Sequence, residues 1–321
     1  MSVPDAVHAF VTYLKPPSLT ALSRDARVMD AAKTLVAAYY YILPFAAFVF
    51  AGNHFSARQN FDPVWSIAWV DLFSLEYASV VACVRIAAVA VSLVAVMWYR
   101  HRAVRILVFL MLFQIHAFES SFGAHNHQWN LWVFTSFVFV FLPDMWRAAV
   151  GTDVARKFLL GIWTAQAVVA LMYSMAGMQK VVTGIQQLIV GEVSGFSILG
   201  FAYHIAYWAP RLQEEVALGA YIISHPVAGW IPFVALIFIQ FFSLWVMVRV
   251  GLHRIWAVVI VLFHIGTYFT MGTSFHPLIL LVIALFFYSP FAREGYTFRE
   301  FMLDLPLVGQ AIEWLGGRSG R

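Results

Sequence analysis

Charged residues are scarce in this chain. Asp, Glu, Lys and Arg make up 11% of its 321 residues, whereas 62% of the residues are apolar. The mean hydropathy is +0.79. Because soluble globular domains carry about 25% charged residues, these values exclude a soluble enzyme and a nucleic-acid-binding module. They predict an integral membrane protein, and the small basic excess (20 Lys and Arg against 16 Asp and Glu) is typical of cytoplasmic loops rather than of nucleic-acid binding.

Cysteine is almost missing as well. Cys83 is the single cysteine, which excludes an internal disulfide and a cysteine-based zinc site. No Walker loop, GxGxxG or CxxC motif occurs, so the sequence carries no signature of nucleotide binding or dithiol chemistry. The first 30 residues contain no apolar core, and we therefore expect no cleavable signal peptide.

Long apolar runs are abundant instead. A membrane-spanning helix needs about 20 mainly apolar residues. Eight stretches qualify: 34–52, 76–98, 106–124, 129–149, 158–179, 229–250, 255–272 and 275–291. The apolar stretches around 194–208 and 215–223 are too short to cross, so we interpret them as re-entrant or interfacial helices within an outer connection, 181–228. The predicted fold is an all-α integral membrane protein with about eight transmembrane helices.

The basic residues predict the orientation of these spans. With eight spans, sixteen Lys and Arg lie on the side of the two termini, and only Arg58, Lys180 and Arg211 lie on the other side. Since basic residues concentrate in cytoplasmic loops, both termini are expected in the cytoplasm. The chain then divides into a cytoplasmic interfacial segment (1–33), a transmembrane domain (34–291) and a cytoplasmic amphipathic tail (292–321).

Several polar residues lie inside the predicted spans or at their outer ends. An ionisable side chain within hydrocarbon costs ~2.5–3.5 kcal/mol, so it needs a partner or a function. The topology places all of these residues in the outer half of the membrane. They are His116, Glu119, His125, Asn126, His127, Lys180, His264 and His276.

Each of these residues also has a purely structural interpretation. Lys180 could extend to the outer interface from the C-terminus of its helix, and His264 could be a core histidine bonded to a neighbouring carbonyl or hydroxyl. His116 and Glu119, three residues apart on one helical face, could form a structural pair. His125 and His127 could belong to an exposed polar turn. We predict no metal site, because Glu119 is the only obvious carboxylate near these histidines.

Three short motifs nevertheless resemble one family. Tyr173-Ser-Met-Ala-Gly-Met-Gln-Lys180 resembles the Tyr-Phe-x-Ala-Gly-x-x-Lys stretch of the membrane region of vitamin K-dependent γ-carboxylases, which bacterial HTTM-type proteins share. Phe263-His264, followed by Met271-Gly272 and Tyr288-Ser-Pro290, is similar to a later pair of spans in that family. Ala124-His-Asn-His127 resembles its Asn-Asn-His segment. The resemblance covers roughly residues 30–292 and implies the bacterial cytoplasmic (inner) membrane.

The resemblance implies an intramembrane, carboxylase-like lyase. Lys180 would act as a base toward a reduced quinone, as the matching lysine of that family does toward vitamin K hydroquinone. His264 and His127 would have supporting catalytic roles. The other polar residues would bind the substrate or tune the site: His116, Glu119, His125, Asn126 and His276. The family's large soluble luminal part has no counterpart here, so we expect a quinol or another lipid-soluble substrate at the outer leaflet rather than peptide glutamate.

Two other functions fit the same residues. The first is a non-enzymatic accessory, maturation or immunity-type membrane protein that binds a peptide, a lipid or a partner subunit. The second is a transporter in which His116 and Glu119 relay protons. The enzyme hypothesis differs from both because it requires Lys180 and His264 to lie close together. The expected surroundings are the lipid bilayer in every case, with no nucleic-acid partner.

Overall fold

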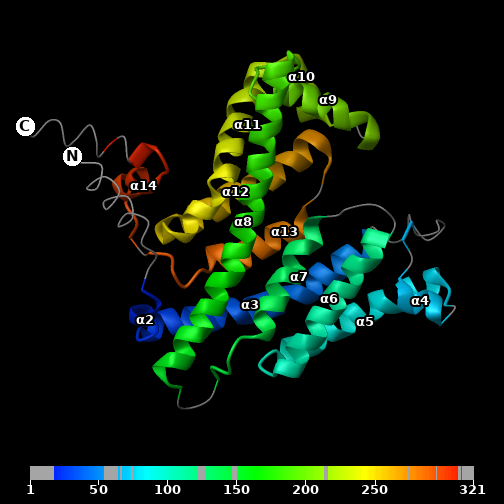
Figure 1. Ribbon diagram of the computed structural model, residues 1–321, viewed down its shortest axis with the longest axis vertical. Helices are drawn as coiled ribbons and strands as arrows, with labels where there is room; N and C mark the ends of the chain where they lie inside the picture. Colours follow the sequence, from blue (N-terminus) through cyan, green and yellow to red (C-terminus); the bar gives the residue numbers. More distant parts are fainter. Residues whose placement is uncertain are drawn as a thin grey trace, which may run out of the picture. The chain divides into compact units, whose positions relative to one another are not determined.

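A computed structural model describes residues 18–53, 64–65, 67–73, 75–121, 127–146, 150–212, 216–273, 275–293, 295–309 and 312. Within these ranges the chain is helical and contains no strand (Figure 1). Three helical segments are long and apolar enough to cross a membrane: Ala26–Phe48, Thr152–Val190 and Val250–Met271. The prediction of a helical protein is therefore confirmed, and these segments have the length and composition of membrane helices.

The helices form two compact units along the chain. Among the described residues, unit 1 comprises Ser18, Val169–Phe275 and the part of the chain from Phe291 onward. Unit 2 comprises Leu19–Val168 and His276–Pro290. The long helix α8 (Thr152–Val190) contributes its first part to unit 2 and its second part to unit 1.

Unit 2 contains most of the N-terminal helices. They are α2 (Leu19–Leu22), α3 (Ala26–Asn53), α4 (Ala68–Leu72), α5 (Tyr77–Trp98), α6 (Arg102–Ser121), α7 (His127–Val140) and the late helix α13 (His276–Val282), which continues as a π-helix over Ile283–Phe287. Its core is strongly aromatic, with Tyr39, Tyr40, Trp129 and Trp132 fully buried.

Side-chain hydrogen bonds hold α13 and its π-helical extension within unit 2. The Trp132 indole donates to the carbonyl of Pro277 at 2.9 Å, and the Gln166 amide donates to the carbonyl of Leu285 at 2.5 Å. In a continuing π-helix the Leu285 carbonyl would accept a hydrogen bond from the N–H of residue 290, but Pro290 has no N–H. The N–H of Ser289 bonds to the carbonyl of Phe286 rather than to that of Leu285. Gln166 thus satisfies a buried carbonyl that the backbone leaves unpaired.

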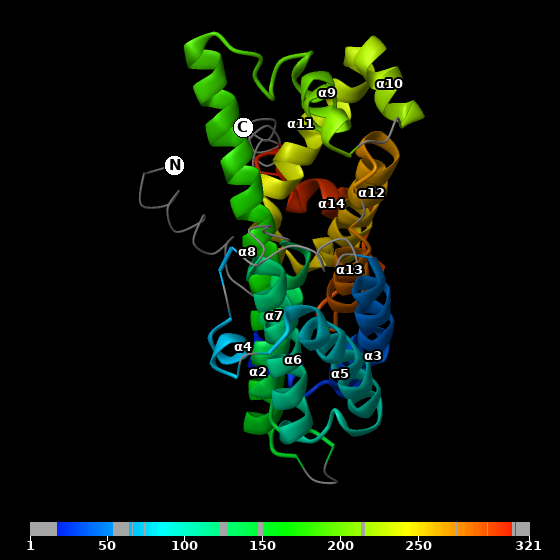
Figure 2. The same cartoon turned by 90° about the vertical axis from the view of Figure 1, so that its right-hand side faces the viewer.

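Unit 1 contains the second part of α8 and the helices after it. These are α9 (Gly200–Leu212), α10 (Ala217–Ser224), α11 (Pro226–Phe241), α12 (His253–Met271) and α14 (Phe298–Asp304), with short 3₁₀ turns over Ser243–Met247 and Val250–Leu252. Helix α9 packs against α10, α11 and α12 (Figure 2). Helices α10 and α11 meet at an angle of 104°, as a broken span or a re-entrant loop would.

Several predicted boundaries need correction. Helix α8 does not end near 179 but continues to Val190, where the N–H of Glu192 bonds to Gln187 and the N–H of Gly191 bonds to Leu188. This is a Schellman motif, and Gly191 has the positive φ of 77° that it requires. The connection after α8 therefore begins at 191 rather than 181, and Lys180 lies well inside a helix instead of at its end.

Other predicted spans are shorter than expected. The 229–250 span is wrong beyond Phe241, where α11 gives way to the 3₁₀ turns. The 129–149 span ends as a helix at Val140. Three further apolar stretches are shorter than a membrane span requires. They lie in α5, in α7 and in α13 with its π-helical extension: Ala82–Trp98, Trp129–Val140 and His276–Phe287. Of the two predicted terminal segments, residues 1–17 and 313–321 lie outside the described part of the chain, and α14 is the helix observed in the tail.

Candidate functional site

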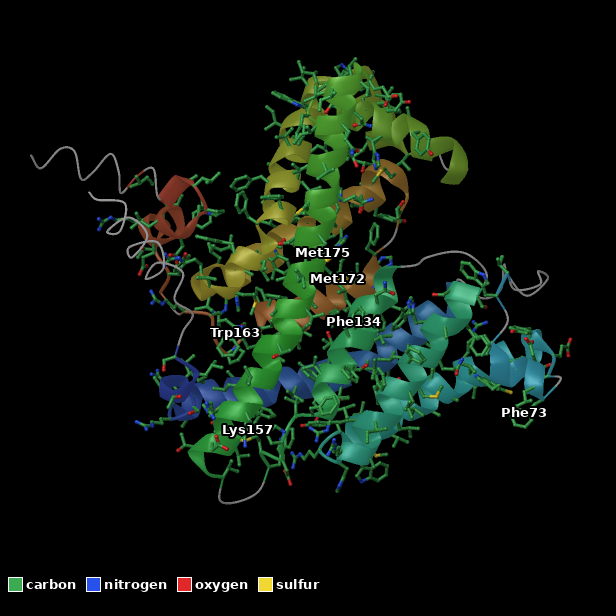
Figure 3. All side chains as sticks on the ribbon, in the orientation of Figure 1. Phe73, Phe134, Lys157, Trp163, Met172 and Met175 are labelled. Atoms are coloured by element: carbon green, nitrogen blue, oxygen red, sulfur yellow. The ribbon has the colours of Figure 1, made fainter. Side chains whose placement is uncertain are left out.

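One face of α8 in unit 1 carries the motif that resembles the carboxylase family. Tyr173, Gly177 and Lys180 are four and three residues apart, so they line up along one side of the helix. Met172 and Met175 mark the same segment in Figure 3, and the Met175 side chain is exposed. The side of α8 that carries Tyr173 and Gly177 is thus its buried side, opposite the exposed apolar side that includes Met175.

Gly177 permits a close approach between α8 and α11. A Cβ atom added there would lie 2.6 Å from the carbonyl carbon of Gln240 and from Cα of Phe241, and closer still to the Phe241 nitrogen. These are backbone atoms that cannot rotate away. One turn earlier, the Ser174 hydroxyl accepts a hydrogen bond of 2.7 Å from the N–H of Leu244, just after α11 ends. Both contacts fix the axial position of α8 in unit 1.

Tyr173 and His264 form a buried pair between α8 and α12. The Tyr173 hydroxyl lies 2.6 Å from Nε2 of His264, and the two side chains are 6% and 3% exposed. The Trp256 ring meets the Tyr173 ring edge to face at 5.3 Å between centroids. The Phe263 and Phe275 rings pack against the imidazole, each at 4.8 Å. His264 is therefore held in an aromatic enclosure with a single hydrogen-bonding neighbour on Nε2.

Lys180 lies near two histidines and no described carboxylate. Its charge acts on both His264 of α12 and His204 of α9, so each histidine is within electrostatic range of Lys180. Lys180 is half-buried, and none of the ion pairs between described residues includes it. Three helices thus bring basic groups together without a described counter-ion.

His204 was not among the residues that the sequence pointed to. Its ring stacks over Phe233 of α11 at 6.3 Å between centroids. Partial desolvation by the surrounding protein, followed by the charge of Lys180, lowers the pKa of His204 below its ordinary value. The sequence signal for His204 was its place within the short apolar stretch 194–208, which is predicted to be a re-entrant or interfacial helix.

The other predicted site residues that the structure describes belong to unit 2. His116 is half-buried in α6, and His276 is exposed at the start of α13. Glu119 lies in α6 and His127 begins α7, but their side chains fall outside the described part of the structure. His125 and Asn126 lie outside the described residues altogether. Of the predicted set, the structure brings together Lys180 and His264 within unit 1.

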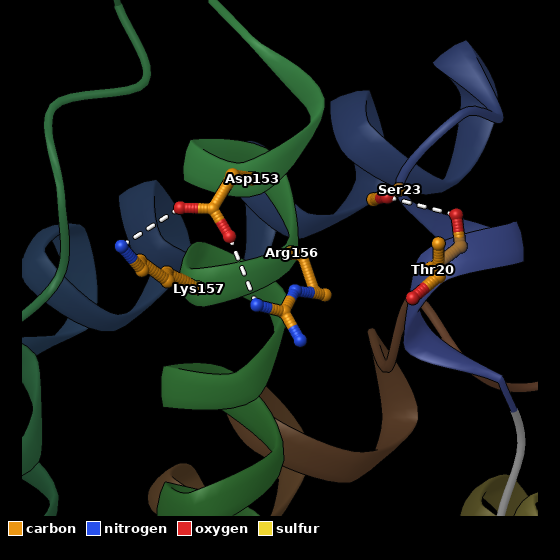
Figure 4. A network of polar contacts seen from close by, with 5 residues as sticks. All are labelled: Thr20, Ser23, Asp153, Arg156 and Lys157. Carbon is orange, nitrogen blue, oxygen red and sulfur yellow. Dashed lines mark hydrogen bonds and ion pairs between the residues drawn. The ribbon is translucent and has the colours of Figure 1, made fainter.

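A metal centre finds no support in the described part of the chain. No group of three or more His, Cys, Asp or Glu side chains there could hold a metal ion. The one compact group of charges on α8 is a surface network in its first turns, where Asp153 pairs with Lys157 at 2.7 Å and with Arg156 at 2.9 Å (Figure 4). Exposed pairs of this kind contribute little to stability, and Lys157 therefore provides a comparison for Lys180 on the same helix.

Comparison with protein-family models, with curated proteins and with solved structures finds no match for this chain.

Proposed function

We propose that this chain is an intramembrane enzyme of the HTTM and vitamin K-dependent carboxylase-like class, acting on a quinol or another lipid-soluble acid. In this proposal it is a protein of about eight spans in a bacterial inner membrane, with both termini in the cytoplasm and the site open to the outer leaflet. The observation that carries the proposal is the grouping of Lys180 with His264 and His204, from three different helices, within unit 1.

Lys180 is the proposed base. A lysine serves as a general base only when burial or neighbouring cations favour its neutral amine. Lys180 is half-buried, its titratable neighbours are histidines, and no described carboxylate pairs with it. In the proposed step the amine nitrogen takes the proton of a substrate hydroxyl, which gives an ammonium group and the substrate anion.

The surrounding residues would orient this step. His264 is fixed by its hydrogen bond to Tyr173, and Gly177 sets the distance between α8 and α11. A reduced quinone is the cofactor or substrate that the family resemblance suggests, and the rings of Trp256, Phe263 and Phe275 around Tyr173 and His264 make the surroundings aromatic. His127 keeps its proposed supporting role, which the resemblance alone supports.

Native mass spectrometry of the purified protein tests the proposal. We expect a co-purifying quinone or similar lipid on the wild-type protein and on Lys157→Met, in which an exposed lysine of the same helix is lost. The ligand should be reduced or lost on Lys180→Met. Full retention by Lys180→Met would contradict a role for this lysine and would favour the accessory alternative, in which the same residues bind a lipid, a peptide or a partner subunit without chemistry.

A further inference from the structure

The buried Tyr173–His264 pair leaves one imidazole nitrogen without a partner. Nε2 of His264 lies 2.6 Å from the Tyr173 hydroxyl, whereas Nδ1 is buried and has no hydrogen-bond partner among the described residues. The side chain is only 3% exposed, so bulk water does not satisfy Nδ1 either. A buried polar atom of this kind is uncommon, since most are hydrogen-bonded.

The number of unpaired groups differs between the two tautomers of a neutral imidazole. If Nε2 carries the proton, it donates to the Tyr173 oxygen, and both the Tyr173 O–H and Nδ1 remain unpaired. If Nδ1 carries the proton, the Tyr173 O–H donates to Nε2, and the Nδ1–H group alone remains unpaired. Because each unpaired buried group is costly, the second arrangement is favoured.

We infer that Tyr173 is a positioning residue that fixes His264 as the Nδ1–H tautomer, so that His264 offers a hydrogen-bond donor to an oxygen atom of the bound substrate. This inference rests on the proposed function for the identity of the acceptor, an oxygen of a lipid-soluble acid. The hydrogen bond between Tyr173 and His264 is itself an observation that does not depend on the proposed function.

The inferred donor complements the proposed base. When Lys180 removes the proton of a substrate hydroxyl, negative charge develops on the oxygen. A fixed N–H group directed at that oxygen stabilises the anion most effectively in a site that excludes water. Lys180 would thus accept the proton, and the Nδ1–H group of His264 would bind the oxygen that loses it. No atom of Tyr173 needs to touch the substrate.

Nitrogen NMR of the ¹⁵N-histidine-labelled protein in lipid nanodiscs tests the inference directly. The two ring signals of His264 are assigned by their loss in His264→Gln. We expect the wild type to show a protonated Nδ1 and an unprotonated Nε2. In Tyr173→Phe, which removes only the hydroxyl, we expect the proton to move partly or wholly to Nε2. Tyr268→Phe, a change at an exposed ring on α12, the helix that carries His264, should leave the wild-type pattern unchanged.

Two results would overturn the inference: a wild-type His264 protonated on Nε2, or a Tyr173→Phe protein with the wild-type pattern. If Tyr173→Phe fails to fold, the wild-type spectrum still decides, because it requires no variant at Tyr173. The experiment contains neither substrate nor a change at Lys180. Its result on the His264 tautomer is therefore independent of whether Lys180 is a base, and the two proposals can fail separately.

Discussion

Replacing Gly177 with alanine places a methyl group where α8 meets the backbone of α11. The new Cβ would lie 2.6 Å from two backbone carbon atoms, at Gln240 and Phe241, so one helix must move. Overpacking of this kind costs ~1–3 kcal/mol, and the upper end applies because backbone atoms cannot rotate aside. The alanine recovers about 1 kcal/mol of helix propensity, which leaves an expected loss of roughly 2 kcal/mol.

Gly266 provides the matched control. It lies inside α12, and an added Cβ would meet no atom within 4 Å. Gly266→Ala should therefore stabilise the protein by up to about 1 kcal/mol, from helix propensity alone. Unfolding by SDS in mixed micelles measures both variants, which should differ by roughly 3 kcal/mol. Equal stabilities would refute the close approach at Gly177 and, with it, the fixed position of the Tyr173–Lys180 face.

Three further predictions follow from single contacts. Lys180→Met should raise the pKa of His204, because it removes a neighbouring positive charge; an unchanged NMR titration would place Lys180 out of range. The hydrogen bonds from Thr297 hold the pKa of Glu300 below its ordinary value. They therefore stabilise α14 fully when the pH is above the ordinary pKa of a glutamate, and this stabilisation is lost as the pH falls through the lowered pKa of Glu300. Amide exchange in α14 should accelerate accordingly, and pH-independent exchange would contradict this. Gly191→Ala should destabilise the end of α8 by ~1–2 kcal/mol because φ is positive there, and unaltered exchange protection around Gln187 would refute it.

The sequence predicted the helical membrane class and some helices well, for clear physical reasons. The stretches 76–98 and 255–272 correspond to α5 and α12 within a few residues. Charged residues mark the start of each helix, Glu76 for α5 and Arg254 for α12. Gly272, in the left-handed conformation, marks the end of α12. Composition alone therefore locates a helix when polar or glycine residues mark its ends.

Helix ends without such markers were mispredicted. The segment after Lys180 contains Thr183, Gln186 and Gln187, which reads as the start of a polar connection but is compatible with a helix. The Schellman glycine, Gly191, was the usable signal for the true end of α8. Conversely, α11 ends at Phe241 inside a mainly apolar stretch without proline or glycine at the break, and contacts with α8 accompany this end.

The candidate site was predicted only in part because sequence gives approximate depth but not lateral position. Lys180 and His264 were both expected in the outer half of the membrane, and Lys180 lies within electrostatic range of His264 in unit 1. His116 and His276 were expected in the same half, yet they belong to unit 2. His204 and the hydrogen bond of Tyr173 depend on how α9 and α12 pack against α8, which no local pattern records.

The most direct test of the central claim, that Lys180 acts as a base toward a lipid-soluble acid, is an absorbance titration with a naphthol bearing an alkyl tail. The protein is held in nanodiscs at neutral pH, and the ionised naphtholate is detected by its own absorption band. The account predicts this band for the wild type and for Lys157→Met, and its loss for Lys180→Met. A wild type that binds the naphthol only in its neutral form, or a Lys180→Met variant with an undiminished naphtholate band, would contradict it.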